Sequence, residues 1–307
     1  MNPGIVVVGS LNMDFVITVE TLPAPGETVL GRDFAMIPGG KGANQANAAA
    51  KLATSHVVKM IGRVGNDVFA DHLKASLAAA GVDVSGVLDT SKQPTGTAFI
   101  WVDQHGQNSI VVASGANHAL TPADLPSFRG ARFVLFQLET PLDTVAAALK
   151  QACGEGAKTI LDPAPAQQLT PDLLAAVDIL TPNESEAAIL IGRKPARIAL
   201  SEALALASAV LALGPKAVIL KLGDRGCLHW DGQTEIHAPP FAVEAKDATA
   251  AGDTFNAALA VALAEDQPMP EALRFANAAA AISVTRKGAQ SSAPGRKEVD
   301  QLLQHKH

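Results

Sequence analysis

The sequence predicts an α/β fold in which a mostly parallel β-sheet carries helices on both faces. Short runs rich in β-branched residues alternate with segments of helical periodicity along most of the 307 residues. Apolar strands that alternate with helices are typical of parallel sheets with two buried faces. Two regions break this alternation, because strand-like runs follow one another there without a helix between them. We interpret those regions as a small second sheet that projects from the main one.

The elements of the main sheet follow one another from the amino terminus. The run Ile5–Val8 predicts the first strand, and residues 42–52 predict the helix after it. Further pairs of a strand and a helix are expected at residues 57–61 and 67–80, 133–138 and 142–152, 159–161 and 172–177, and 179–180 and 184–191. Strands at 218–220 and 227–230 precede a final third that is largely helical. Because no repeat or linker divides the chain, we expect one domain over residues 1–307.

The small sheet is expected within residues 12–36 and 95–115. Its strands are predicted at 15–19, 28–34, 97–102 and 109–113, with a polar, hairpin-like turn at 103–108. Successive residues in 99–102 are all apolar, so both faces of this sheet need cover. One face could close over a substrate while the other meets a second copy of the chain, which predicts a lid and a homodimer. An ordinary buried strand is the alternative.

Composition and charge exclude several classes of function. The chain has a net charge of −6 and no cluster of lysine and arginine, which argues against nucleic-acid binding. Its cysteines, Cys153 and Cys227, are isolated, as is typical of a reducing compartment. The first apolar run is too short for a signal peptide, and no apolar stretch approaches the length of a membrane span. We therefore expect a cytoplasmic protein that binds small molecules and neither nucleic acid nor membranes.

The most informative segment is 247–259, where a turn of small residues runs directly into an apolar helical pattern. Free N–H groups at a helix start, together with the helix dipole, form an anion site that small side chains leave accessible. Asp253 near the start of this helix would repel an anion, unless its task is to take a proton from a nucleophile that attacks the bound phosphate. The alternative is a first-turn carboxylate favoured only by the dipole.

A second glycine-rich turn, residues 39–46, opens the first helix and could bring Lys41 to a polyhydroxyl ligand. It lacks the spacing of a P-loop, and the chain contains no GxGxxG motif. Asn12, Asp14 and Glu139 follow strand ends, where open α/β sheets bind their ligands. Their amide and carboxylate groups suit vicinal hydroxyls. The alternatives are a flexible turn with a solvated lysine and ordinary turn-forming side chains.

The segment 181–186 contains a capping box, Thr181 with Glu184, and Pro182 is expected at the first helical position. Asn183 and Glu186 are not part of this capping box, and they could hold the waters of a magnesium ion, which prefers few direct protein ligands. The loop 221–226 leaves a strand through two glycines and could carry a nucleotide, although a tight turn is equally consistent.

The polar loop 286–292, together with carbonyl groups around Asp247 and Thr249, could surround a monovalent cation. Other chemistries have no support in the sequence. The chain lacks HExxH and paired metal-ligand spacings for zinc, and it lacks the GxSxG motif of an α/β hydrolase.

Taken together, these residues resemble the ribokinase-like family of sugar and nucleoside kinases over essentially the whole chain. The resemblance rests on residues 9–14, 25–28, 39–47, 162–166, 181–186, 250–254 and 285–290. The strings 39–46 and 285–290 point to the ribokinase branch of that family. The resemblance implies a ribokinase-like fold with a small β-sheet lid, and ATP-dependent phosphorylation of D-ribose at its 5-hydroxyl. It also implies Mg²⁺ and an activating K⁺. A related kinase for deoxyribose, another sugar or a nucleoside is the alternative, and a non-catalytic sugar-binding sensor is a remote one.

The resemblance also assigns individual residues. The sugar-binding positions are Asn12, Asp14, Gly40, Lys41, Asn44, Glu139 and Asp253. The catalytic base is Asp253, and the anion hole consists of Ala250, Ala251 and Gly252. The nucleotide-binding positions are Asn183, Glu186, Lys221, Gly223, Asp224, Arg225, Gly226, Gly252 and Asn277. The monovalent-cation loop contains Asp247, Thr249, Ser283, Arg286, Gly288 and Ser292, mostly through backbone carbonyls, and Glu186 lies near the magnesium ion through water.

Three positions depart from the family pattern. Ala250 replaces the glycine of the wider family, which is tolerated because the anion-hole donors are main-chain groups. Lys221 stands where a hydroxyl residue is more usual. Asp162 takes the place of a common asparagine, with no expected consequence for the chemistry.

Overall fold

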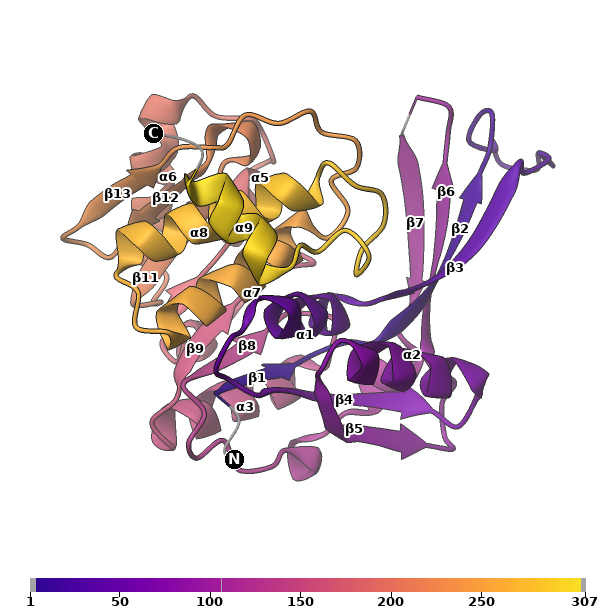
Figure 1. Ribbon diagram of the computed structural model, residues 1–307, viewed down its shortest axis with the longest axis horizontal. Coiled ribbons are helices and arrows are strands. Elements are labelled where there is room, and N and C mark those ends of the chain that lie inside the picture. Colours follow the sequence, from indigo (N-terminus) through magenta and orange to yellow (C-terminus); the bar gives the residue numbers. More distant parts are fainter. Residues whose placement is uncertain (1–3, 106, 305–307) are drawn as a thin grey trace.

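The computed structural model describes residues 4–105 and 107–304, and within them a nine-stranded sheet forms the centre of the molecule (Figure 1). Its order is β13-β12-β11-β10-β9-β8-β1-β4-β5. The parallel strands are β5 (Asp83–Thr90), β4 (Val58–Gly65), β1 (Ile5–Val8), β8 (Phe133–Phe136), β9 (Lys158–Leu161), β10 (Ile179–Leu180) and β11 (Ala217–Lys221). Two antiparallel strands, β12 (Cys227–Trp230) and β13 (Glu235–Ala238), complete one edge. The predicted mostly parallel sheet is confirmed.

Helices cover both faces of this sheet, because alternate residues of each inner strand point to opposite sides. Ile5 and Val7 belong to the core that contains residues of α1 (Lys41–Leu52), α2 (Val68–Ala79), α7 (Ala251–Ala264), α8 (Met269–Ser283) and α9 (Arg296–Gln304). Val6 and Val8 belong to the core that contains residues of α3 (Leu142–Gly154), α4 (Pro171–Leu174), α5 (Glu184–Leu190) and α6 (Ala203–Leu211). All four residues of β1 are buried, as expected for a strand covered twice.

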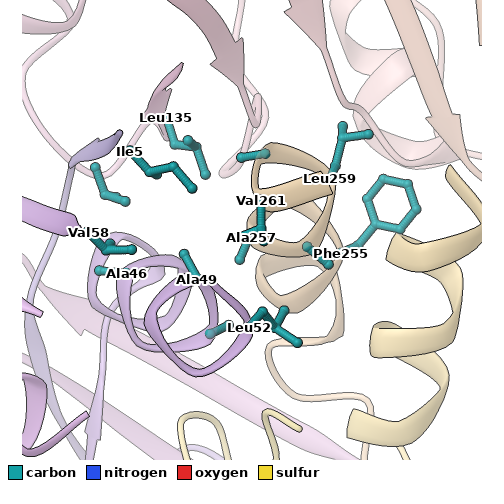
Figure 2. Packing of buried hydrophobic residues seen from close by; sticks show 14 of the residues in the cluster. Ile5, Ala46, Ala49, Leu52, Val58, Leu135, Phe255, Ala257, Leu259 and Val261 are labelled. Carbon is teal, nitrogen blue, oxygen red and sulfur yellow. The ribbon is translucent and has the colours of Figure 1, made fainter. Parts of the chain in front are cut away.

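Small side chains let α1 and α7 lie close together on the first face. Figure 2 shows Ala49 of α1 on the side toward Ala257 of α7, whereas Ala46 lies beside Val58, and Ile5 of the sheet belongs to the same core. Alanine adds little bulk, so the two helices approach one another closely. The first turns of α1 and α7 are thereby brought together, and they form the centre of the site described below.

A separate four-stranded sheet, in the order β3-β2-β6-β7, projects from the edge of the main body within the described residues (Figure 1). Its strands are β2 (Asn12–Thr18), β3 (Asp33–Gly39), β6 (Gly96–Val102) and β7 (Asn108–Ala113). Phe15 stacks on Phe99 with 5.1 Å between ring centroids and meets the edge of Phe69 of α2 at 5.5 Å. These rings join the small sheet, the predicted lid, to the main domain.

Several predicted boundaries are wrong for identifiable reasons. The strand predicted at 28–34 begins only at Asp33, since residues 27–31 have no regular structure and residue 32 forms a bend. The helix predicted at 172–177 ends at Leu174. The strand β5 was not predicted because its sequence, DVSGVLDT, is polar, as suits a strand at the sheet edge. The predicted turn 103–108 includes Gly106, which lies outside the described residues. No helix in the described chain is long and apolar enough to cross a membrane.

Candidate active site

The first turn of α7 holds Asp253 against the first turn of α1. Its carboxylate is buried and accepts hydrogen bonds from Asn44 Nδ2 and Gln45 Nε2, each at 3.1 Å. The α1 turn reaches this position because Gly40, with φ of 88°, begins the helix. A Cβ at Gly40 would lie 2.7 Å from the backbone nitrogen of Asn12, so glycine is required there. The predicted base and one predicted sugar residue, Asn44, are thus in direct contact.

The backbone before Asp253 has the geometry of a helix start with free donors. Ala250 adopts a left-handed conformation, with φ of 56° and ψ of 16°, and its carbonyl accepts the first helical bond from Thr254 at 2.9 Å. The N–H of Ala251 donates to the carbonyl of Ala248 at 3.2 Å. The N–H groups of Gly252 and Asp253 have no partner within the helix, because they belong to its first turn. Those two donors are the ones best placed to receive an anion.

Two further carboxylates, Asp14 and Glu139, lie near Asp253. Glu139 accepts hydrogen bonds from the Lys41 backbone N–H at 3.1 Å and from the hydroxyl of Ser10. Asp14 belongs to the lid strand β2, and its carboxylate lies against Gly39 of β3. A Cβ added to Gly39 would be 2.1 Å from Asp14 Oδ2. Burial, together with the charges of Glu139 and Asp253, raises the pKa of Asp14 to about 7.

Lys41 provides the positive charge among these acids. Burial by itself would lower its pKa, but the surrounding carboxylates, led by Asp253 and Asp162, raise it above the ordinary value. Burial raises the pKa of Asp253 to about 6, although the charge of Lys41 opposes that rise. Near neutral pH, Lys41 is charged and Asp253 is mostly ionised. The arrangement can therefore accept a proton from a hydroxyl group and attract a negative ligand.

Asn12 is oriented by Asn117, a residue that the sequence did not reveal. Asn117 Nδ2 donates to Asn12 Oδ1 at 2.7 Å, and its own Oδ1 accepts from the Leu11 N–H at 2.9 Å. Both asparagines are buried. Asn117 lies in the short 3₁₀ segment Gly115–Ala119, more than a hundred positions from Asn12 in sequence. No local pattern could have identified it.

Gln45 and Gln137 were also missed. Gln137 Nε2 donates to Gln45 Oε1 at 2.7 Å, which turns the amide group of Gln45 toward two carboxylates. Gln45 Nε2 lies 3.1 Å from Asp253 Oδ1 and 3.4 Å from Asp162 Oδ2. Gln45 falls within the glycine-rich segment 39–46, next to the predicted sugar residue Asn44. That position was the one sequence signal that could have identified it as a site residue. Gln137 had no comparable signal.

The predicted capping box at Thr181 and Glu184 is wrong. Asn183 caps α5 instead, and Glu186 closes the box: Glu186 N donates to Asn183 Oδ1 at 2.8 Å, and Asn183 N donates to Glu186 Oε2 at 2.7 Å. Beyond β10 the chain stays alongside β11, because the Lys221 N–H donates to Pro182 O at 2.8 Å and Asn183 forms an isolated bridge with Lys221. The helix therefore starts after Asn183, and Pro182 stands outside it.

The loop 221–226 turns sharply through its glycines. Gly223 and Gly226 have φ of 61° and 82°, and a Cβ at Gly226 would lie 2.1 Å from the Ala238 carbonyl oxygen. Arg225 pairs with Glu184 at 2.6 Å. The side chain of Asp224 pairs with Arg197 at 2.8 Å, and Asn277 Nδ2 donates to Ala238 O and Pro239 O at 3.0 and 3.1 Å. These polar side chains are engaged with protein groups, so nucleotide contacts from this loop would come from its backbone.

The predicted cation loop joins two distant segments through Asp247. Its carboxylate accepts from Thr249 N and Gly288 N, both at 2.9 Å. Arg286 pairs with Glu298. The hydroxyls of Ser283 and Ser292 donate to nearby backbone carbonyls, Ala280 O and Ala289 O, at 2.8 Å each. The two segments meet, and their cation remains a prediction.

Comparison with known proteins agrees with this fold. Residues 2–296 match the model of the pfkB family of carbohydrate kinases. The chain is 43% identical to ribokinase of Haemophilus influenzae, over 99% of this chain and all of that protein. It is also 43% identical to ribokinase of Bacillus subtilis, over 97% of this chain and 99% of the relative. The solved structure of Arabidopsis thaliana ribokinase complexed with ribose and ATP matches with a TM-score of 0.91 and 36% identity over the full length of both chains. The chain belongs to the pfkB family of carbohydrate kinases.

Proposed function

We propose that this protein transfers the γ-phosphoryl group of ATP to the 5-hydroxyl of D-ribose, giving ribose 5-phosphate. The observation that carries the proposal is the position of Asp253. Its carboxylate is held by Asn44 and Gln45 at the start of α7, beside N–H groups free to receive an anion. A base next to an anion site is what phosphoryl transfer to an alcohol requires. The ribokinase relatives and the ribose–ATP complex of the Arabidopsis protein support this choice of substrates.

The sugar would be held where the lid joins the main sheet. Asn12, Asp14, Gly40, Lys41, Asn44 and Glu139 are the sugar-binding groups of this proposal. The carboxylates accept hydrogen bonds from sugar hydroxyls, while amide groups can donate or accept. Fixing the ring in this way brings its primary hydroxyl toward Asp253, and such positioning supplies a large part of the rate of phosphoryl transfer.

Proton transfer then acts on the sugar hydroxyl, and charge stabilisation acts on the phosphoryl group. Asp253 accepts the proton of the 5-hydroxyl, a contribution typically worth about 10²–10⁴-fold. The turn of residues 250–252 opens the anion hole, in which the N–H groups of Gly252 and Asp253 and the helix dipole stabilise the charge of the migrating group. Closure of the lid excludes water and limits wasteful hydrolysis of ATP.

The nucleotide would lie between α5, the loop 221–226 and α8. Asn183, Glu186, Lys221 and Asn277 border that space, together with backbone groups of Gly223, Asp224, Arg225 and Gly226. The residues fit a magnesium ion: Glu186 is a half-buried carboxylate and Asp253 a buried one, and burial, with a smaller contribution from the charge of Asp162, raises the pKa of both. Glu186 would hold the ion through water. When bound, magnesium would supply positive charge that offsets the negative charge of the nucleotide phosphates.

A potassium ion would occupy the loop that joins Asp247 and Thr249 to Gly288. The hard oxygens of that loop, including backbone carbonyls near Ser283, Arg286 and Ser292, suit a monovalent cation. It would order the neighbouring anion hole and take no part in the chemistry. We expect higher turnover in potassium than in a bulky organic cation of equal ionic strength. Equal turnover in the two salts would contradict the assignment.

The protein is further proposed to act in the cytoplasm as a homodimer formed through the lid, with residues 1–307 as one domain. Two free cysteines and the apolar lid support these points.

The decisive experiment incubates the purified protein with magnesium-ATP and ribose, deoxyribose, other sugars and nucleosides. We expect the highest kcat/KM for ribose. A site built to hydrogen-bond a hydroxyl discriminates strongly against an analogue that lacks it. Preferred turnover of deoxyribose or a nucleoside would select a related kinase instead, and sugar binding without turnover would select a sensor.

A further inference from the structure

Two positions at which the chain departs from the family pattern, Asp162 and Lys221, are in contact with each other. Asp162 follows β9 and Lys221 ends β11, on either side of β10 in the sheet. Lys221 Nζ lies 3.0 Å from Asp162 Oδ1, and the two side chains are only 14% and 4% exposed. An unpaired charge at either position would be costly in this buried setting. The buried charge at each position is therefore compensated by the opposite charge at the other.

The ammonium group of this pair lies at the start of α7. A methyl group added to Gly252 would be 3.4 Å from Lys221 Nζ, so the charge is adjacent to the proposed anion hole. An ammonium group has three N–H donors, and Asp162 receives one of them. The others can reach an anion at Gly252. Lys221 also faces the carboxylate of Glu186, whose pKa it lowers against the larger effect of burial.

Asp162 connects this ammonium group to the catalytic base. Its Oδ2 lies 3.4 Å from Gln45 Nε2, and the same amide nitrogen donates to Asp253 Oδ1 at 3.1 Å. Gln137 fixes the orientation of Gln45 by donating a hydrogen bond to its Oε1. One carboxylate thus touches both the group that orients the base and the cation beside the anion hole.

We propose that Lys221 donates hydrogen bonds to the migrating γ-phosphoryl group, and that Asp162 is the positioning residue that keeps its ammonium group beside Gly252. The inference rests on the proposed function, because it needs ATP at this anion hole. Proton transfer is the same as in the proposed function: Lys221 stays protonated, and Asp253 takes the proton of the sugar hydroxyl. A positive charge at this point stabilises negative charge that develops on the phosphoryl oxygens during transfer. The alternative is an ion pair that only stabilises the ends of β9 and β11.

The first test removes the ammonium group in Lys221→Met. It compares a nucleotide that has a γ-phosphate with one that lacks it. We expect kcat to fall about 10²–10³-fold, the usual cost of losing one donor to the developing charge. Calorimetry should show weaker binding of a non-hydrolysable ATP analogue, by about tenfold or more, while ADP binding changes little. A purely structural pair would affect both nucleotides equally. Equal losses for the two nucleotides, or an unchanged kcat, would overturn the role of Lys221.

The second test asks whether Asp162 acts through Lys221. Asp162→Asn should lower kcat, and the double variant Asp162→Asn/Lys221→Met should be no worse than Lys221→Met alone, since residues that act as a unit are not additive. Losses that multiply would show that Asp162 acts independently, which overturns its positioning role. The thermal midpoint and ribose affinity of each variant, measured in parallel, identify any loss that comes from misfolding.

A matched control lies at the other end of the same strand. Lys216 precedes β11, and its Nζ lies 2.9 Å from Asp178 Oδ1, a lysine–aspartate pair far from the site. Lys216→Met should keep kcat and both nucleotide affinities within about twofold. Wild-type turnover of ribose is measured in the same series. Its absence would contradict the proposed function, whereas normal wild-type turnover with an unaffected Lys221→Met would contradict only this inference.

Discussion

At the scale of single residues, the site depends on carboxylates that burial makes unusually basic. Asp253 and Asp14 have pKa values raised to about 6 and about 7, chiefly by burial. A base whose pKa lies near the working pH balances ionisation against proton affinity. The hydrogen bonds from Asn44 and Gln45 hold Asp253 without removing that basicity. The same side chain would be a weaker base if it were fully solvated, because its pKa would be near 4.

Asp253→Asn tests the base directly. Asparagine keeps the shape of the side chain but cannot accept the proton, so kcat should fall by about 10²-fold or more. Affinity for sugar and ATP should stay within a few-fold, as measured by calorimetry. Turnover close to that of the wild type would contradict the assignment of Asp253.

The raised pKa values also predict the pH profile. Both carboxylates must be ionised to accept a proton or a sugar hydroxyl, so kcat/KM for the sugar should fall as pH decreases through about 7 and then about 6. Asp14→Asn should leave only the lower transition, which belongs to Asp253. The measurement is initial rate against pH at saturating magnesium-ATP. A profile that stays flat from about pH 5.5 to about 8 would contradict this interpretation.

At the scale of elements, the turn before α7 determines where the proposed anion hole lies. Ala250 holds a left-handed conformation, which costs a residue with a Cβ roughly 1 kcal/mol. That conformation turns the chain so that the first-turn N–H groups face the site. The close contact of α1 with α7 depends in turn on alanines such as Ala49 and Ala257, which bring the two helix starts together (Figure 2).

Two substitutions at Ala250 separate conformation from chemistry. Ala250→Gly should change the free energy of unfolding by less than about 1 kcal/mol, because relief of the left-handed cost is offset by the greater freedom of unfolded glycine. Its kcat should be retained. Ala250→Val should lose more than about 1 kcal/mol and most of the turnover, since a β-branched residue resists positive φ. Urea unfolding and initial rates measure both, and a tolerated valine would contradict the role of the turn.

At the scale of the whole molecule, the lid presents two different faces. Asp14 points to the opposite side from Phe15, because successive strand residues alternate. The side of Phe15 also carries Met36 and Val111, which register places beside Phe15 and Phe99 and which are 51% and 55% exposed. One face therefore carries Asp14 of the proposed sugar site, and the other has exposed apolar residues, through which we propose that a second copy of the chain binds.

Met36→Glu should weaken the proposed homodimer by roughly tenfold or more, because the interface would then bury an unpaired charge. Leu200→Glu, which changes an exposed leucine far from the lid, should leave association unchanged. Sedimentation velocity across a range of concentrations measures both. A wild-type protein that stays monomeric, or a Met36→Glu variant that dimerises normally, would contradict the assignment of this face.

The sequence by itself determined the class of fold, the two glycine-rich turns and the membership of the kinase family, all of which are confirmed. These features are local, because a periodic apolar pattern or a turn of small residues carries its own structural preference. The small sheet was recognised from the same local signals, although its second strand begins later than predicted.

Only the tertiary structure decided which distant side chains meet. Asn117 orients Asn12 and Gln137 orients Gln45 across about a hundred positions. The cap of α5 is Asn183 because the chain beyond β10 still pairs with Lys221 at that residue. Asp162 had no expected role until its contact with Lys221 was visible. Such contacts depend on strand order and on the packing of helices against the sheet. A one-dimensional pattern records what each segment prefers, and it does not record which segments become neighbours.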